Sequence, residues 1–218
     1  MIKLCIFDLD GTVLDTVSTI AHYANYALER HGIAPIETKE YRYLAGCGIT
    51  SLLRGTLKYR GYDRDEALYE SFFRTYDDAY NRDASYLTRI FDGMKETLDE
   101  IKARGIKIAI VSNKPDFAAK EVVSKLYGEG YFDFVTGETA AYPLKPDPSS
   151  VLAALERFGA KKSEALYIGD TSTDMQTAKN AGLFAVGVLW GFRDEAELVA
   201  SGADAIVDSP RQLLTLLG

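Results

Sequence analysis

Polar residues follow four short apolar runs of this 218-residue sequence. The segments are DLDGT at 8–12, SN at 112–113, KP at 145–146 and GDTSTD at 169–174. If at least three of their carboxylates were brought together, they would repel one another and be forced to protonate unless a cation shared the site. Hard oxygen ligands without Cys or His favour Mg²⁺ over softer transition metals. The residue types therefore predict a magnesium site.

The same residues could bind and transfer a phosphoryl group. A serine and a lysine beside such a cation, with N–H groups of a glycine-containing turn, form a receptor for a phosphate dianion. A carboxylate next to a metal-bound phosphoryl group can act as a nucleophile and form an aspartyl-phosphate. Asp10 lies two residues after Asp8, on the same side of an extended strand, where it could serve as general acid and base.

Six short apolar runs predict the strands that would position these residues. They are residues 3–7, 107–111, 132–136, 165–168, 184–189 and 205–207. Helical patterns lie between them, at 94–104, 116–126, 149–158 and 173–181. The alternation predicts an α/β fold with a doubly wound, Rossmann-like and mostly parallel sheet. In such a sheet the polar groups would meet at the edge formed by the carboxyl ends of the strands.

Residues 16–92 interrupt the alternation. They contain helical patterns at 17–31, 41–59 and 64–81 and no convincing strand. We expect a small all-helical domain here, inserted after the first strand, with residues 1–15 and 93–218 forming the core domain. Ten of the fourteen tyrosines fall in the insert, at positions 23, 26, 41, 43, 59, 62, 69, 76, 80 and 86. Most of these rings are expected to fill its interior.

Composition and charge exclude several classes of function. Twenty-five basic residues against 32 acidic residues give a net charge of −7, which disfavours a nucleic-acid partner. Two cysteines cannot form a disulfide framework, and no Cys/His cluster predicts zinc. The first ten residues lack room for a signal peptide, and no apolar run approaches the roughly 18 residues of a membrane span. We expect a cytoplasmic protein without a membrane partner; the sequence does not indicate its oligomeric state.

The four motifs, in their order and spacing, resemble those of the haloacid dehalogenase-like superfamily. The matching segments are DLDGT at 8–12, VSNK at 111–114, KP at 145–146 and GDTSTD at 169–174. The insert resembles the helical cap of that superfamily, and the likeness spans essentially the whole chain. Finer features resemble the phosphoglycolate phosphatase branch: LD at 14–15, SNKP at 112–115, AVGVLWGFR at 185–193 and GAD at 202–204.

The resemblance implies a role for each carboxylate and for the lysine. Asp8 would be the nucleophile and a Mg²⁺ ligand. Asp10 would protonate the leaving oxygen and then activate water, while its backbone carbonyl binds Mg²⁺. Lys145 would offset charge between the phosphoryl group and Asp8. Asp170 would coordinate Mg²⁺, and Asp174 would lie in the outer shell or contact the ion through water.

The resemblance also implies residues that bind phosphate. Thr12 and Ser112 would hold the phosphate, assisted by the backbone N–H groups of Leu9 and Asn113.

Three residues of the insert correspond to the part of the branch that faces the active site. Arg42 could bind a small substrate carboxylate through its planar guanidinium, or it could be a surface cation. Gly46 and Gly48 could contact substrate, or they could simply break a helix.

The expected function is Mg²⁺-dependent hydrolysis of a small phosphomonoester through an aspartyl-phosphate, with phosphoglycolate as the best single candidate. A phosphosugar mutase or a pyrophosphatase of the same superfamily is the alternative within enzymes. A non-catalytic phospho-aspartate switch would need neither Asp10 nor a 77-residue insert. A dehalogenase is disfavoured, because superfamily members that attack carbon lack the second aspartate of the first motif, which is Asp10 here.

Overall fold

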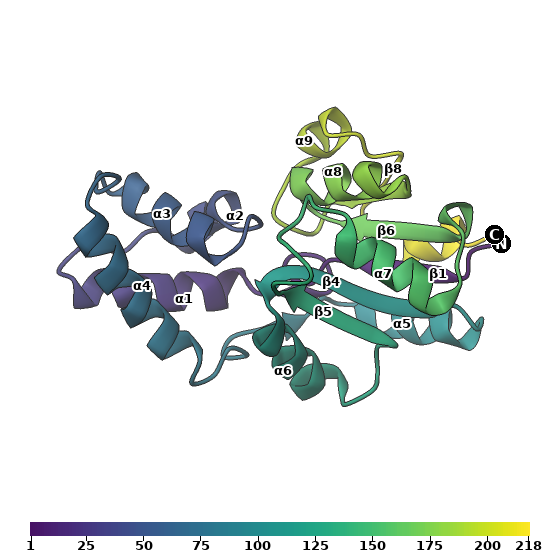
Figure 1. Cartoon of the computed structure of the whole chain (residues 1–218), viewed down its shortest axis with the longest axis horizontal. Coiled ribbons are helices and arrows are strands. Elements are labelled where there is room, and N and C mark those ends of the chain that lie inside the picture. Colours follow the sequence, from purple (N-terminus) through teal and green to yellow (C-terminus); the bar gives the residue numbers. More distant parts are fainter.

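A six-stranded parallel sheet lies at the centre of the larger part of the structure, a computed structural model that describes residues 1–218 (Figure 1). The spatial order is β5-β4-β1-β6-β7-β8. The strands are β1 (Leu4–Phe7), β4 (Lys107–Pro115), β5 (Phe134–Glu138), β6 (Ala165–Gly169), β7 (Phe184–Val188) and β8 (Ala205–Val207). Every neighbouring pair is parallel, so the doubly wound α/β fold expected from the alternation is confirmed.

The register of the sheet brings the predicted motifs to one edge. Phe7, the last residue of β1, pairs with Ile110 of β4 on one side and with Ile168 of β6 on the other. β1 and β6 therefore end at nearly the same level, while β4 continues to Pro115, so that Ser112 and Asn113 lie in β4 just beyond the level at which β1 ends. The polar residues of the motifs are thus neighbours at this edge.

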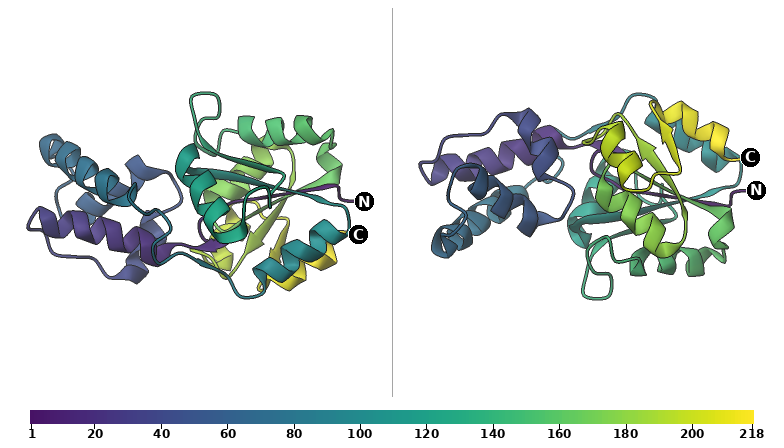
Figure 2. Two further views of the ribbon diagram at one scale, coloured as in Figure 1. Left: turned by 90° about the horizontal axis from the view of Figure 1, so that it is seen from below. Right: turned by 90° about the horizontal axis from the view of Figure 1, so that it is seen from above.

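Helices cover both faces of the sheet (Figure 2). Alternate residues of β1 are buried on opposite faces: Cys5 and Phe7 belong to one apolar cluster, and Leu4 and Ile6 to the other. The first cluster includes residues of α5 (Met94–Ala103), α6 (Asp116–Tyr127) and the 3₁₀ helix η3 (Pro210–Leu216). The second includes residues of α7 (Ser149–Phe158), α8 (Ser172–Ala181) and α9 (Glu195–Ala200). The 3₁₀ helix η2 (Lys162–Glu164) precedes β6.

Four further helices lie to one side of the sheet, beyond the carboxyl ends of its strands (Figure 1). They are α1 (Val17–Arg30), α2 (Tyr41–Leu44), α3 (Ile49–Tyr59) and α4 (Glu66–Tyr80), with the 3₁₀ helix η1 (Thr38–Glu40) before α2. The chain enters and leaves this group through an antiparallel pair of two-residue strands, β2 (Leu14–Asp15) and β3 (Arg89–Ile90). No helix of the structure is long and apolar enough to cross a membrane.

Three expectations about the insert were wrong. β3 falls within residues 16–92, where no strand was expected, and two residues are too few to form a pattern. The helix expected at 41–59 is interrupted by residues 45–48, where Gly46 and Gly48 have φ of +112° and +84°. Only four of the ten tyrosines are buried, and five are exposed. The four helices leave much of their surface exposed, so the insert offers too little interior for ten rings.

Candidate active site

Three buried aspartates meet at the carboxyl edge of the sheet. Asp8 directly follows β1, Asp170 directly follows β6, and Asp174 lies in the first turn of α8. Each offers a carboxylate oxygen within 4.8 Å of the others. Asp8 is 4% exposed, and the other two are fully buried. The structure thus brings together residues that are more than 160 positions apart in the sequence.

Lys145 joins two of these aspartates. Its Nζ lies 2.7 Å from Asp8 Oδ1 and 2.7 Å from Asp174 Oδ1, and the residue is 5% exposed. Burial disfavours the charged ammonium, but the carboxylates of Asp174 and Asp8 outweigh burial and raise the pKa of Lys145. Asn113 fixes the backbone at this point, since its Oδ1 accepts a hydrogen bond from Lys145 N at 2.7 Å.

Asp174 is saturated with hydrogen bonds from the protein. Its Oδ2 accepts from the backbone N–H of Thr171 at 3.0 Å and from the Thr171 hydroxyl at 2.7 Å. Its Oδ1 accepts from Lys145 and, at 3.2 Å, from the hydroxyl of Tyr167. Asp174 is therefore firmly held, with Thr171 as the N-cap of α8.

The Asp170 carboxylate is enclosed by two loops that approach it closely. Its Oδ1 accepts from the Thr12 hydroxyl and its Oδ2 from the backbone N–H of Phe192, both at 2.8 Å. Gly11 has a φ of +88°, and a side chain there would place its Cβ 2.8 Å from Asp170 Cγ. A Cβ at Gly191 would likewise collide with Asp170 and with the backbone of Gly11. Only glycines allow both loops to approach this carboxylate so closely.

Charge in the site is unbalanced in a way that suits a divalent cation. Burial first, and then the nearby Asp174, raise the pKa of Asp170 to about 7. Burial and Asp174 also raise the pKa of Asp8 well above its usual value, against the opposing effect of Lys145. With Asp10, four carboxyl groups meet only two ammonium groups, those of Lys145 and Lys114, so the acidic groups outnumber the cations. The oxygen-only donor set fits a hard divalent cation, so the buried aspartates can hold a metal ion.

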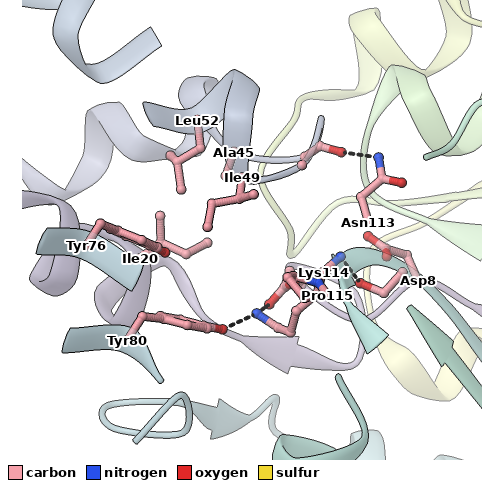
Figure 3. Close-up of a pocket in the computed structure, with 14 residues that line it drawn as sticks. Asp8, Ile20, Ala45, Ile49, Leu52, Tyr76, Tyr80, Asn113, Lys114 and Pro115 are labelled. Atoms are coloured by element: carbon pink, nitrogen blue, oxygen red, sulfur yellow. Dashed lines mark hydrogen bonds and ion pairs between the residues drawn. The ribbon is translucent and has the colours of Figure 1, made fainter. Parts of the chain in front are cut away.

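Asp10 and Ser112 line a cavity directly above Asp8. The cavity has a volume of about 60 Å³. Its polar floor comes from the sheet edge, and its apolar ceiling comes from the helical insert (Figure 3). The floor consists of Asp8, Asp10, Ser112, Asn113, Lys114 and Pro115. The ceiling consists of Ile20, Ala45, Gly46, Gly48, Ile49, Leu52, Tyr76 and Tyr80.

The remaining residues predicted from the sequence have different positions. Gly46 and Gly48 line the cavity, as a contact with substrate would require. Arg42 does not: its exposed side chain borders a separate cavity, together with Asp15 and Trp190. Leu9 is fully buried beneath the site, and its carbonyl accepts hydrogen bonds from the backbone of the turn that contains Gly11 and Thr12.

Sequence reasoning missed Lys114 and Tyr80. The Nζ of Lys114 lies 3.0 Å from Asp10 Oδ1 and donates a hydrogen bond to the Tyr80 hydroxyl at 2.7 Å. Burial opposes the charge on Lys114, but Asp10 and Tyr80 outweigh burial and raise its pKa. The one available signal was that Lys114 directly follows the Ser-Asn pair of the second motif.

The insert is fastened to the sheet domain beside the cavity. Asn113 Nδ2 donates to Gly46 O at 3.1 Å. Arg193, in the loop between β7 and α9, donates to the carbonyls of Arg42 and, at 2.9 Å, of Ala45. Its Nε also pairs with Glu197 at 3.2 Å. These contacts hold residues 45–48 down over the cavity.

Comparison with known proteins agrees with this geometry. The family model for haloacid dehalogenase-like hydrolases matches residues 5–188. The chain is 32% identical to a phosphoglycolate phosphatase of Vibrio parahaemolyticus, over 99% of this chain and 96% of that protein. It is 29% identical to the N-acetylmuramic acid 6-phosphate phosphatase of Pseudomonas aeruginosa, over 99% of this chain and 95% of the relative.

A solved structure from Lactobacillus delbrueckii, described as a candidate phosphoglycolate phosphatase, has the same fold. It superposes with a TM-score of 0.92 at 28% identity, covering 99% of this chain and 98% of its own. The family match extends over most of the sequence and includes Asp8, Lys145 and Asp170. The chain therefore belongs to the haloacid dehalogenase-like hydrolase family.

Proposed function

We propose that this phosphatase hydrolyses small phosphomonoesters through phosphorylated Asp8 and depends on Mg²⁺, with phosphoglycolate as the first candidate substrate. One observation carries the proposal. The Asp8 carboxylate lies at the floor of the cavity, beside the ammonium of Lys145 at 2.7 Å, and Asp10 lines the same cavity. A nucleophile, a cation and a second carboxyl group thus surround one small space.

We assign the metal to the aspartate triad. Asp8, Asp170 and the carbonyl of Asp10 would hold Mg²⁺ directly. Asp174 suits the outer shell, because four donors of the protein already occupy its two oxygens. The bound ion would neutralise part of the negative charge on the phosphoryl oxygens.

The chain's own residues supply the chemical steps. A carboxylate oxygen of Asp8 attacks phosphorus, the ester P–O bond breaks, and Asp10 gives its proton to the departing alkoxide oxygen. Asp10, now a carboxylate, then takes a proton from water as that water attacks phosphorus. The bond between Asp8 and phosphorus breaks, inorganic phosphate leaves, and both aspartates return to their starting states. Lys145 holds Asp8 in line and offsets negative charge.

The cavity favours a small substrate. In this structure residues 45–48 close over a space of about 60 Å³ whose ceiling is largely apolar. A short leaving group such as glycolate suits this space better than the sugar of the Pseudomonas relative's substrate. We propose that residues 16–92 act as a cap that opens to admit substrate, with Gly46 and Gly48 against the leaving group. Arg42 borders a separate cavity in this structure, so its side chain would have to move in order to bind a substrate carboxylate here.

The test is phosphate release from phosphoglycolate, N-acetylmuramic acid 6-phosphate, hexose phosphates, nucleotides and pyrophosphate, with Mg²⁺ and with EDTA. We expect steady turnover of small alkyl phosphates, lost with EDTA and in Asp8→Asn. Turnover by Asp8→Asn would refute the nucleophile. Preference for the muramic acid phosphate would refute the size argument. Conversion of a hexose 1-phosphate into its 6-phosphate would show a mutase.

A further inference from the structure

The ammonium of Lys114 lies between the two parts of the molecule. Lys114 is the second-last residue of β4 and so belongs to the sheet domain, and its side chain is 7% exposed. One contact reaches Asp10 Oδ1 at 3.0 Å, also on the sheet side. The other reaches the hydroxyl of Tyr80, the last residue of α4 in the cap, at 2.7 Å (Figure 3). None of the roles proposed above uses this lysine.

The Lys114 ammonium is the only charged partner of the Asp10 side chain. Its Oδ1 is buried and makes no hydrogen bond, and Lys114 forms its one ion pair. The second buried lysine of the site cannot replace Lys114, because Lys145 Nζ already lies 2.7 Å from both Asp8 and Asp174. Without Lys114 this buried oxygen would be left unpaired. Because an unpaired buried oxygen is costly, the Asp10 side chain would then rotate out of its position beside Asp8.

The ring of Tyr80 is held in place by other residues of the insert. Its ring stacks on Tyr76 at 5.4 Å between centroids, with 11° between the planes. Tyr23 packs against the same ring in a T-shaped arrangement, at 5.4 Å between centroids, and the Tyr23 hydroxyl donates to Asp83 O at 2.6 Å. These contacts lie within the insert, so the Tyr80 hydroxyl moves with the cap.

We propose that Lys114 and Tyr80 are positioning residues that orient Asp10 toward the leaving group when the cap is closed. The inference rests on the proposed function, since it concerns the acid of that reaction. Closure supplies the Tyr80 oxygen, which fixes the ammonium. The ammonium in turn holds Oδ1 of Asp10, so that the other carboxyl oxygen, which carries the proton, faces the leaving group. When the cap is open, Lys114 loses the Tyr80 hydroxyl as a partner, and the Asp10 side chain is less firmly oriented. Proton donation is thereby coupled to closure over the substrate.

Leaving-group dependence separates this role from a structural one. Acetate departs without a proton, whereas an alkoxide needs one, so a displaced acid slows alkyl phosphates selectively. The assay follows loss of acetyl phosphate or of the best alkyl phosphate of the panel by rapid quench, with enzyme in excess over substrate and Mg²⁺ present. This single turnover reports only formation of phosphorylated Asp8.

Lys114→Met keeps the apolar stem and removes the charge. We expect it to slow the alkyl phosphate about 100-fold, the usual effect of a misplaced catalytic group, and acetyl phosphate less than about threefold. Tyr80→Phe should slow the alkyl phosphate about five- to tenfold, the value of one hydrogen bond, with acetyl phosphate unchanged. In the Lys114→Met background Tyr80→Phe should have no further effect, because both act through one path.

The chain offers matched controls. Lys120→Met removes an exposed lysine that pairs with Asp116, and Tyr59→Phe removes an exposed hydroxyl at the end of α3, away from the cavity. Both should retain the rates of the unsubstituted enzyme.

Equal slowing of the two substrates by either variant would overturn the proposal, as would independent effects of the two substitutions. If Lys114→Met fails to fold, Tyr80→Phe alone decides, by the same comparison. Failure of the proposed function would look different, because the unsubstituted enzyme would then consume neither compound.

Discussion

Replacing Asp170 by Asn should stabilise the metal-free protein at alkaline pH. Asp170 is fully buried beside Asp174, and its pKa is raised to about 7 from a reference value of 3.8. A carboxyl whose pKa is higher in the folded state destabilises the fold once it must ionise. The cost is absent below the unfolded pKa, grows as the pH rises, and is complete above about pH 7.

The magnitude follows from the same values. Each pKa unit is worth about 1.4 kcal/mol, so ionising Asp170 in the folded state costs about 4 kcal/mol. About 3 kcal/mol of this cost develops between pH 5 and pH 8. The amide can keep the hydrogen bond from Phe192 N, and the Thr12 hydroxyl can turn to accept from the amide nitrogen, so the offset is about 1 kcal/mol. We therefore expect a net gain of about 2–3 kcal/mol at pH 8 and little gain at pH 5.

Urea denaturation in EDTA at pH 5 and pH 8 measures this difference, with Asp63→Asn, an exposed aspartate without an ion pair, as the control. At pH 8 added Mg²⁺ should stabilise the unsubstituted protein and have little effect on Asp170→Asn. The reasoning fails if the unsubstituted protein is the more stable of the two at pH 8, or if their difference is the same at both pH values.

Three other substitutions test other parts of the site. Lys145→Met should destabilise the metal-free protein by about 3–5 kcal/mol in urea denaturation, because it leaves buried carboxylates unpaired. The control Lys179→Met removes an exposed ion pair with Asp204 and should cost less than about 1 kcal/mol. Gly11→Ala should cost more than Gly61→Ala in the same assay: both positions have a left-handed φ, of +88° and +82°, but only at Gly11 does the new Cβ meet Asp170. Arg193→Met should lower kcat/KM about tenfold in steady-state kinetics, because closure loses the charged hydrogen bonds to the carbonyls of Arg42 and Ala45. An unchanged kcat/KM would contradict a role in closure.

The sequence was sufficient to predict the parallel sheet and the convergence of the motifs at its edge. Apolar runs show where buried strands end, and the carboxyl ends of parallel strands lie at the same edge of the sheet, so the neighbourhood of Asp8 and Asp170 follows from one rule. The cap was harder to predict. The orientation of Arg42 depends on how a four-residue helix is placed against the sheet domain, and no local pattern encodes that placement.

The Lys114–Tyr80 contact shows the same difficulty at the site itself. The two residues are 34 positions apart and belong to different parts of the molecule. A lysine after the second motif and one tyrosine among ten carry no signal of their own, because only the folded structure shows that the end of α4 lies against the sheet edge. Composition showed that the insert was rich in rings but could not show which ring would face Asp10.

The paired strands β2 and β3 make the insert a separable module. Leu14 pairs with Ile90 and Asp15 with Arg89, so the chain leaves the sheet domain and returns to it at adjacent points. Paired residues of antiparallel strands lie only about 5 Å apart, whatever the intervening chain does. The 73 residues between Asp15 and Arg89 could therefore be lengthened, shortened or exchanged without moving Asp8 or Asp170. The aspartates of the sheet edge can thus keep their places while the insert diverges during evolution.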